Sequence, residues 1–330
     1  MSPTLGFTGD VMLGRNVDRQ RRGEPPERVW GSALPRFRDL DGLFVNLECA
    51  LSTRGSQWTR THRPFHFRAD PDWAVPALES AGVDWAALAN NHLLDYEAVA
   101  LLDTIEHLDG ADIAHAGAGR DVATASQPSI VEVGGLRVGL CSFTDNTPEY
   151  AAGPDRPGVA RIEMDLAEDE RALVRNVLET IRAGQPDLVV ASLHWGPNMT
   201  AYPAEQYRRF GRWLLEEGVD LVHGHSAHVF QGVERLENGV VLHDCGDFVD
   251  DYAVDRELRN DRSFLFEVDV TPAGDLERLR LRSVEIADCA VNTVAGEPSA
   301  WWRETMRERS EPFGTAGAFE RAGDGLELAL

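Results

Sequence analysis

The stretch Leu188-Val-Val-Ala-Ser-Leu-His194-Trp195-Gly196 decides the fold of this chain. Residues 188–193 have the pattern of a buried strand, and the polar block His194-Trp195-Gly196 begins where the apolar run ends. Three other strand-like runs end in the same way: residues 5–8 before Gly9-Asp10, residues 43–45 before Asn46-Leu47-Glu48, and residues 219–222 before the block from Gly224 to His228. Ligands of open α/β folds bind beyond the carboxyl ends of strands, so these blocks are expected to meet at one place.

A fifth block, Asn90-Asn91-His92, follows residues 83–89, which are too mixed to assign as a strand. Together the five blocks supply carboxylates, a carboxamide and several imidazoles, and no cysteine. This set of donors suits one or two divalent ions such as Mn, Fe or Zn. A divalent ion can lower the pKa of a water molecule to about 7, so a metal-dependent hydrolase is the first hypothesis.

Length and composition limit the classes of protein to consider. A chain of 330 residues can bury a large core. No run of eighteen apolar residues is present, so no membrane-spanning segment is expected. The N-terminus shows no basic segment followed by an apolar one, which favours a cytoplasmic location. The four cysteines form no CxxC pair and are expected to be structural residues in a reducing compartment.

The charge balance is strongly one-sided. All 32 basic residues are arginine, against 55 acidic residues, and the net charge is −23. Such a surface excludes general binding to nucleic acid, because phosphate contacts need a positive field. The arginine bias fits either a genome that favours Arg codons or adaptation to molar salt, where repulsion is screened within about 3 Å. The complete absence of lysine beside so much acid favours a halophilic protein.

The order of elements predicts βα units first and hairpins interleaved with βα units later. Helices are predicted at residues 70–80, 96–108, 165–181, 203–217 and 301–309, and hairpins at 129–143, around Asn238-Gly239 and at 263–286. Asp70 is expected to cap the first helix and Gly82 to end it. The pattern favours a mixed sheet or two stacked sheets with helices outside. One domain is expected over residues 1–295, followed at 296–330 by a C-terminal helix and a loosely ordered tail.

The five blocks, in this order, resemble the poly-γ-glutamate capsule biosynthesis family CapA, which is related to calcineurin-like metallophosphoesterases. The segments His115-Ala-Gly-Ala-Gly119 and Cys245-Gly246-Asp247-Phe248 also look like family blocks, and the likeness covers roughly residues 5 to 290. The resemblance implies an α/β fold, a four-layer α/β/β/α sandwich of metallophosphoesterase type with mixed sheets. It also implies a metal site at the strand ends.

Roles for individual residues follow from the same resemblance. The implied metal ligands are Asp10, Glu48, Asn91, His194, His225 and His228. Glu48 stands where a carboxylate that bridges two ions is expected. His92 is implied as the catalytic residue that protonates the leaving group, with Asp95 offsetting the effect of a nearby cation on its pKa.

The sequence shows three departures, two from the phosphoesterase pattern and one from the pattern of the capsule family. Met12 stands where a second metal-binding histidine is usual, so one metal position loses a ligand. The last two histidines are spaced His-x-x-His instead of His-x-His, and Asp247 stands where the capsule family commonly has Asn. His223 lies two residues before His225, on the same face of a strand, and competes with it for the ligand role.

Three further residues are candidates for substrate binding. Arg15 is expected to hold an anionic group through a bidentate contact, with a plain surface charge as the alternative. Asn90 precedes the implied ligand Asn91 and is assigned to substrate binding. Trp195 is expected either to form a wall of the pocket or to be a buried aromatic residue. A polar loop containing His62 and His66 is expected to cover the site.

The predicted function is that of a CapA-like metal-dependent hydrolase, acting on a phosphoester or a γ-glutamyl or other amide bond in poly-γ-glutamate capsule metabolism. Its expected partner is a small-molecule or polyanionic polymer substrate, with neither nucleic acid nor a membrane involved. The alternative is a non-catalytic accessory protein that grips the polymer during capsule biosynthesis. The sequence leaves open the bond cleaved, the metal and the oligomeric state.

Overall fold

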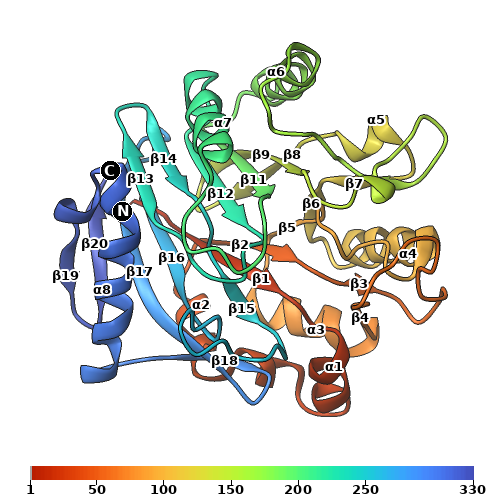
Figure 1. Ribbon diagram of the computed structural model, residues 1–330, viewed down its shortest axis with the longest axis horizontal. Coiled ribbons are helices and arrows are strands. Elements are labelled where there is room, and N and C mark those ends of the chain that lie inside the picture. Colours follow the sequence, from red (N-terminus) through yellow and green to blue (C-terminus); the bar gives the residue numbers. More distant parts are fainter. Residues whose placement is uncertain (1) are drawn as a thin grey trace.

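Two β-sheets packed face to face, with helices on their outer faces, form the molecule (Figure 1). The computed structural model describes residues 2–330. The main path of the ten-stranded sheet is β19 (Glu320–Ala322), β20 (Gly325–Ala329), β17 (Leu276–Ala287), β16 (Arg262–Val270), β1 (Thr4–Val11), β2 (Gly42–Leu47), β5 (Trp85–Ala87) and β6 (Ala114–Ala116). Beside this path, β15 (Asp247–Val249) pairs with β1, and β18 (Ala290–Thr293) pairs with β17.

The second sheet has six strands. Their order is β13 (Val233–Leu236), β14 (Gly239–Leu242), β12 (Leu221–His225), β11 (Leu188–His194), β9 (Leu136–Thr144) and β8 (Ser129–Val133). Both sheets are mixed, since β1 runs parallel to β2 and antiparallel to β16, and β11 runs parallel to β12 while β8 and β9 form an antiparallel hairpin. Two small pairs complete the strands: β3 (Ala50–Leu51) with β4 (Arg68–Ala69), and β7 (Ala118–Gly119) with β10 (Gly158–Val159).

Within residues 2–330, eight α-helices surround the sheets. They are α1 (Arg15–Arg21), α2 (Leu34–Phe37), α3 (Pro71–Ala81), α4 (Glu97–Gly110), α5 (Val122–Ala125), α6 (Glu168–Ala183), α7 (Glu205–Glu216) and α8 (Ala300–Ser310). None of those within residues 2–330 has the length and apolar character needed to cross a membrane.

Three apolar cores hold the layers together. The first lies between the sheets, where Phe7 and Phe44 of the larger sheet meet Leu140 and Val190 of the smaller one. The second joins the larger sheet to α3 and α4, and the third joins the smaller sheet to α6 and α7. The central strands β1, β2, β11 and β12 are therefore buried on both faces, which explains their nearly continuous apolar runs in the sequence. The expected four-layer α/β/β/α sandwich with mixed sheets is confirmed.

The predicted boundary signals of α3 are confirmed in detail. The Asp70 carboxylate accepts a hydrogen bond from the Asp72 amide at 3.1 Å, and Gly82 ends the helix with a φ of +72°. The chain thus satisfies an amide at the start of the helix that has no partner within it.

Replacing Asp70 with Ala is expected to lower the free energy of unfolding by about 1 kcal/mol, the usual effect of losing an N-cap side chain. Urea unfolding followed by circular dichroism would measure the change. The conservative variant Asp70→Asn keeps an accepting oxygen and should stay close to wild type. Equal losses in both variants would contradict the capping role.

The C-terminal segment differs from the expected loose tail. Strand β20 pairs along β17, with Leu328 opposite Leu279 and Leu326 opposite Leu281. Leu326 and Leu328 are buried, as is Trp302 of α8. The two chain ends consequently lie near each other at the same side of the molecule (Figure 1). The tail is an integral part of the larger sheet, because its alternating leucines enter the core between the sheets.

Candidate metal centre

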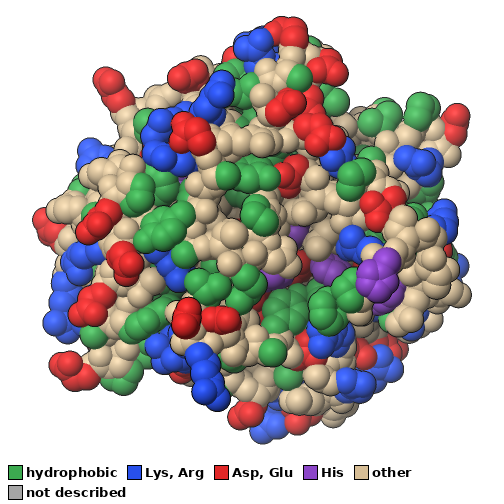
Figure 2. Space-filling view, in the orientation of Figure 1, with side chains coloured by type: hydrophobic (Ala, Val, Ile, Leu, Met, Phe, Trp, Pro, Cys, Tyr) green, Lys and Arg blue, Asp and Glu red, His purple; other side chains and the backbone are tan. Residues whose placement is uncertain are grey.

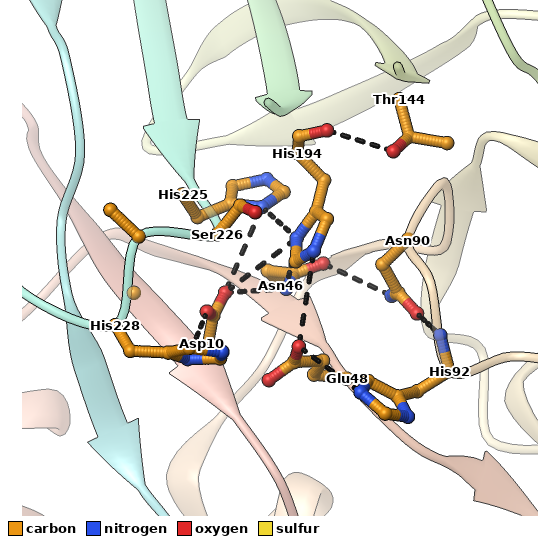
Figure 3. A network of polar contacts seen from close by, with 12 residues as sticks. Asp10, Asn46, Glu48, Asn90, His92, Thr144, His194, His225, Ser226 and His228 are labelled. Carbon is orange, nitrogen blue, oxygen red and sulfur yellow. Dashed lines mark hydrogen bonds and ion pairs between the residues drawn. The ribbon is translucent and has the colours of Figure 1, made fainter. Parts of the chain in front are cut away.

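The polar blocks meet where parallel strands from both sheets end (Figure 3). In the larger sheet, Asp10 of β1 lies opposite Asn46 of β2 and Asp247 of β15. In the smaller sheet, His194 of β11 lies opposite His225 of β12. Because the two sheets face each other, these ends close around one buried space. Figure 2 shows a hollow in the same face, with histidine and acidic side chains at its bottom.

Glycine allows the strand ends to come this close. A Cβ added at Gly9 would lie 1.7 Å from the Gly246 carbonyl oxygen, and that same oxygen accepts a hydrogen bond from the Asp10 amide at 2.8 Å. A Cβ at Gly224 would lie 2.1 Å from the His243 carbonyl oxygen. Only glycine fits at either position, so the residue that follows each of them is held at the strand end.

Two sets of ligand atoms share Asp10. Asp10, His194 and His225 form one set, and Asp10, Glu48, His228 and Asp247 form the other, with all atoms of a set within 4.8 Å of one another. The nearest pairs are His228 Nδ1 with Asp247 Oδ1 at 2.8 Å and with Asp10 Oδ2 at 3.4 Å. Glu48 Oε1 lies 3.8 Å from His194 Nε2 and so faces both sets. Each set could hold a metal ion, and Asp10 belongs to both sets.

The buried carboxylates fit a cation. Asp10 Oδ2, Glu48 Oε1 and Asp247 Oδ2 are all buried without a hydrogen-bond partner. Burial and the charge of Asp10 raise the pKa of Glu48 well above its usual value, and burial likewise raises the pKa of Asp247. Several carboxyl groups in one dry space repel each other unless a positive charge lies between them. Oxygen and nitrogen donors of this kind suit a divalent ion.

Two of the histidines, His194 and His225, have the neutral state that metal ligands need. Burial lowers the pKa of His194 to about 3 and moves that of His225 well below 6.5, so both rings are neutral. Their Nδ1 atoms lie 3.0 Å apart and face Asp10. Burial opposes the charge on His228, but the carboxylates of Asp247 and Glu48 outweigh it and raise the pKa well above 6.5. His228 thus carries, in this structure, the positive charge that an ion would supply.

Two asparagines hold the carboxylates in place. Asn46 donates to Asp10 Oδ1 at 2.7 Å, and its own oxygen accepts from Asn90 at 3.2 Å. Asn90 also donates to the Leu47 carbonyl oxygen at 2.8 Å and accepts from the His92 amide at 3.1 Å. Every polar atom of the fully buried Asn90 side chain therefore has a protein partner. This amide connects the strand ends. Its role in substrate binding stays a prediction.

His92 lies at the edge of the cluster. Its Nδ1 is 2.6 Å from Asp95 Oδ2, and its Nε2 points to Glu48 Oε1 at 3.9 Å. Asp95 is fixed in turn by the Phe67 amide at 2.7 Å and the Tyr150 hydroxyl at 2.9 Å. The Phe67 ring stacks on the imidazole with centroids 3.7 Å apart. Burial lowers the pKa of His92, while Asp95 raises it again in part.

Asn91 and His223 were predicted as a metal ligand and as a competing ligand, and the structure places their side chains as follows. The Asn91 side-chain oxygen is buried without a hydrogen-bond partner, and its backbone oxygen accepts from Arg63. Its role as a ligand stays a prediction. His223 does not compete with His225, since its Nε2 contacts the Thr8 carbonyl oxygen at 2.7 Å and its Nδ1 contacts Ser192 Oγ at 3.1 Å.

Trp195 lies in the core as a buried aromatic residue, the second of its two expected roles. The indole is 3% exposed and belongs to the core between the smaller sheet and α7. Its N–H donates to the His243 carbonyl oxygen at 2.8 Å. Trp195 follows His194 directly, and consecutive side chains of an extended segment point to opposite faces. The imidazole therefore faces the cluster while the indole faces the helices.

The rings of Phe67 and Tyr252 lie between Arg15 and the candidate metal centre. Its guanidinium carbon is 5.6 Å from the Phe67 ring centroid and 5.9 Å from that of Tyr252, and its Nε is 3.4 Å from Asp251. The Tyr252 hydroxyl donates to Glu48 Oε2 at 3.3 Å. Direct contact of Arg15 with a reacting group stays a prediction.

Sequence reasoning missed three contributors to the centre, namely Asn46, Asp247 and Tyr252. Asn46 and Asp247 both stood in quoted blocks, and their position directly at a strand end was the available signal. Tyr252 had no such signal, because it reaches Glu48 from an irregular segment after β15. Met12, at the position of the missing histidine, is buried with its sulfur accepting from the Gly14 amide at 3.1 Å.

Comparison with known proteins gives consistent matches. Residues 4–252 match the family described as bacterial capsule synthesis protein PGA_cap. A "Probable polyglutamine synthesis accessory protein" of Mycobacterium tuberculosis is 33% identical, over 94% of this chain and 92% of the relative. The "Capsule biosynthesis protein CapA" of Bacillus anthracis is 27% identical, over 75% of this chain and 60% of the relative. Among solved structures, TT1561 of Thermus thermophilus aligns with 84% of this chain and covers 98% of its own chain, at 10% identity and a TM-score of 0.45.

Proposed function

The chain belongs to the bacterial capsule synthesis protein PGA_cap family, and from this premise we propose that it is a metal-dependent hydrolase of capsule polymer metabolism. The observation that carries the proposal is the pair of ligand sets around Asp10, with three buried carboxylate oxygens that lack a partner. A phosphoester or a γ-glutamyl or other amide bond is the proposed target. Mn, Fe and Zn all suit the donors.

In the proposed mechanism, metal binding and proton donation belong to different residues. When bound, divalent ions would polarise the phosphoryl or carbonyl group and lower the pKa of a water molecule, so that hydroxide is available as the nucleophile at neutral pH. Asp10, Glu48, Asp247, His194, His225 and His228 would hold the ions, with Asn91 as a further proposed ligand. The fixed His92 ring, with Nδ1 against Asp95, presents Nε2 toward the cluster and would give its proton to the leaving oxygen or nitrogen.

Asp247 makes up for Met12 in this arrangement. Asp247 lies opposite Asp10 in the sheet and belongs to the ligand set with Asp10, Glu48 and His228, so it would supply a donor atom that Met12 cannot. A carboxylate in place of an imidazole adds one negative charge, which favours retention of a hard divalent cation.

The test of the proposed function compares two substrate classes. Protein loaded with Mn²⁺ in molar KCl would be assayed with bis-p-nitrophenyl phosphate and with γ-glutamyl-p-nitroanilide, against the chelator-treated protein as control. Metal-dependent turnover of either compound would support hydrolysis and identify the bond. Stoichiometric metal without turnover of either would contradict it.

A second function is favoured by the name of the relative from Mycobacterium tuberculosis, which describes that protein as a probable accessory of polyglutamine synthesis. In this alternative the same centre grips a capsule polymer without cleaving it. Tight polymer binding by metal-loaded protein, with unchanged polymer length after prolonged incubation, would support the accessory role over the hydrolase.

A further inference from the structure

A cavity of about 460 Å³ lies beside the metal centre and carries an unusual charge for this chain. Its walls include Arg15 and Arg19 of α1, Arg22 directly after α1, and Arg68 of β4. Arg15 and Arg19 are four residues apart in α1. Gly14 lets α1 approach β4, since a Cβ there would lie 2.8 Å from the Arg68 amide nitrogen.

The acidic residues in the same walls already have structural partners. Asp18 accepts from the Asp70 amide at 2.8 Å and the Trp73 indole at 2.7 Å, while Asp70 caps α3. Both also form ion pairs with Arg22: its guanidinium is 2.5 Å from Asp18 Oδ2 and 3.2 Å from Asp70 Oδ2. Arg15 has one further acidic partner, Asp251, at 3.4 Å. Four guanidinium groups against three carboxylates still leave an excess of positive charge at the cavity.

Two of the arginines have no acidic partner among residues 2–330. Arg19 contacts only the Asn16 side chain, and Arg68 donates to the Arg54 carbonyl oxygen at 2.8 Å and lies 3.9 Å over the Tyr96 ring. The segment leading to β4 continues this character: residues 50–69 hold four arginines and two histidines without one acidic residue. In a chain with a net charge of −23, such a segment marks a place where an anion is favoured.

The cavity adjoins the proposed reaction site. Arg15 lines the cavity and also faces the rings of Phe67 and Tyr252. Phe67 stacks on His92, and the Tyr252 hydroxyl donates to Glu48. A substrate that reached from the metals across these two rings would place its next charged group beside Arg15, Arg19 and Arg68.

We propose that this arginine-lined cavity is an anion-binding subsite that holds a second charged group of a polyanionic substrate while the first lies at the metal centre. The inference rests on the proposed function, whose substrate class it narrows to chains with repeated anionic groups. Carboxylates and phosphates share the chemistry that guanidinium groups recognise. The probes below distinguish these two sources.

The test uses manganese-loaded protein and measures dissociation constants by calorimetry. The probes are a polyglutamate of defined length, a linear polyphosphate of similar charge, and free glutamate and inorganic phosphate as single-anion ligands. The variant Arg19→Gln/Arg68→Gln is expected to bind the preferred polymer at least about tenfold more weakly, the effect of losing charge-assisted hydrogen bonds, with little change for the single anions. Arg19→Lys/Arg68→Lys should recover part of the loss.

The matched control is Arg38→Gln/Arg209→Gln, which removes two exposed arginines elsewhere that also lack an acidic partner in the described chain. Equal weakening in this control, or wild-type affinity in the Arg19/Arg68 variant, would overturn the subsite. Thermal unfolding and metal content check that each variant is folded and loaded. Polymer binding that depends on Arg19 and Arg68 in a protein that takes up no Mn²⁺ would support the subsite and contradict the hydrolase. Failure of the subsite proposal is therefore distinguishable from failure of the proposed function.

Discussion

Replacing Asp10 with Asn is expected to abolish metal binding at both positions, whereas Asp247→Asn is expected to weaken only one. Asp10 belongs to both ligand sets, while Asp247 belongs to the set with Glu48 and His228. An uncharged amide cannot replace an anion between two cations. Loss of an outer-shell partner costs about 10–100-fold in metal affinity, and loss of the shared ligand should exceed that. Elemental mass spectrometry of protein purified in molar KCl without a metal-affinity tag would measure both effects.

The matched control for this experiment is Asp84→Asn. Asp84 accepts a hydrogen bond from the Leu43 amide at 2.8 Å, at the opposite end of β2 from Glu48. It undergoes the same chemical change far from the ligand sets and should keep the wild-type metal content. An Asp10→Asn protein that is folded and still fully loaded would contradict the shared role of Asp10. Complete loss of metal in Asp247→Asn would contradict the division into two sets.

The variant His92→Asn is expected to lower kcat by about 10²–10⁴-fold without changing the metal content. His92 belongs to neither ligand set, and its Nε2 lies 3.9 Å from Glu48 with the ring fixed by Asp95. The loss therefore falls on proton transfer to the leaving group. Steady-state kinetics with whichever model substrate is cleaved, together with elemental analysis, would measure both parts.

The pH profile gives a second readout for His92. A general acid must be protonated, and burial lowers the pKa of this imidazole below 6.5. In the wild type, kcat/KM is therefore expected to fall as the pH rises through that lowered pKa, and His92→Asn should lack this limb. His115→Asn is the control, because His115 pairs with Asp109 at 3.1 Å outside the ligand sets. Undiminished turnover in His92→Asn would exclude the acid role.

Much of the fold could be predicted because local signals and burial agree. Apolar runs ending in polar blocks mark strands that are buried on both faces, and Asp70 and Gly82 mark the ends of α3. The tail was misjudged because β20 is only five residues long and owes its order to pairing with β17. Its glycine and acidic neighbours indicated disorder, and only the tertiary partner decides the outcome.

The site was predictable only in part, for a geometric reason. Strand-end residues such as Asp10, Glu48 and His194 converge because parallel strands end at one edge. Asp247 joins them through β15, a three-residue strand that pairs with β1 across more than two hundred residues of sequence, and no local pattern shows such a pairing. The arginine cavity likewise depends on the contact between α1 and β4, which the sequence does not show.

The most direct test of the central claim is anomalous diffraction from crystals grown with Mn²⁺. Two manganese peaks are expected within coordination distance of Asp10. One should also contact His194 and His225, and the other should also contact Glu48, His228 and Asp247. Fully ordered side chains at these positions, with water in place of any anomalous peak at saturating Mn²⁺, would contradict a metal centre and with it the proposed hydrolase.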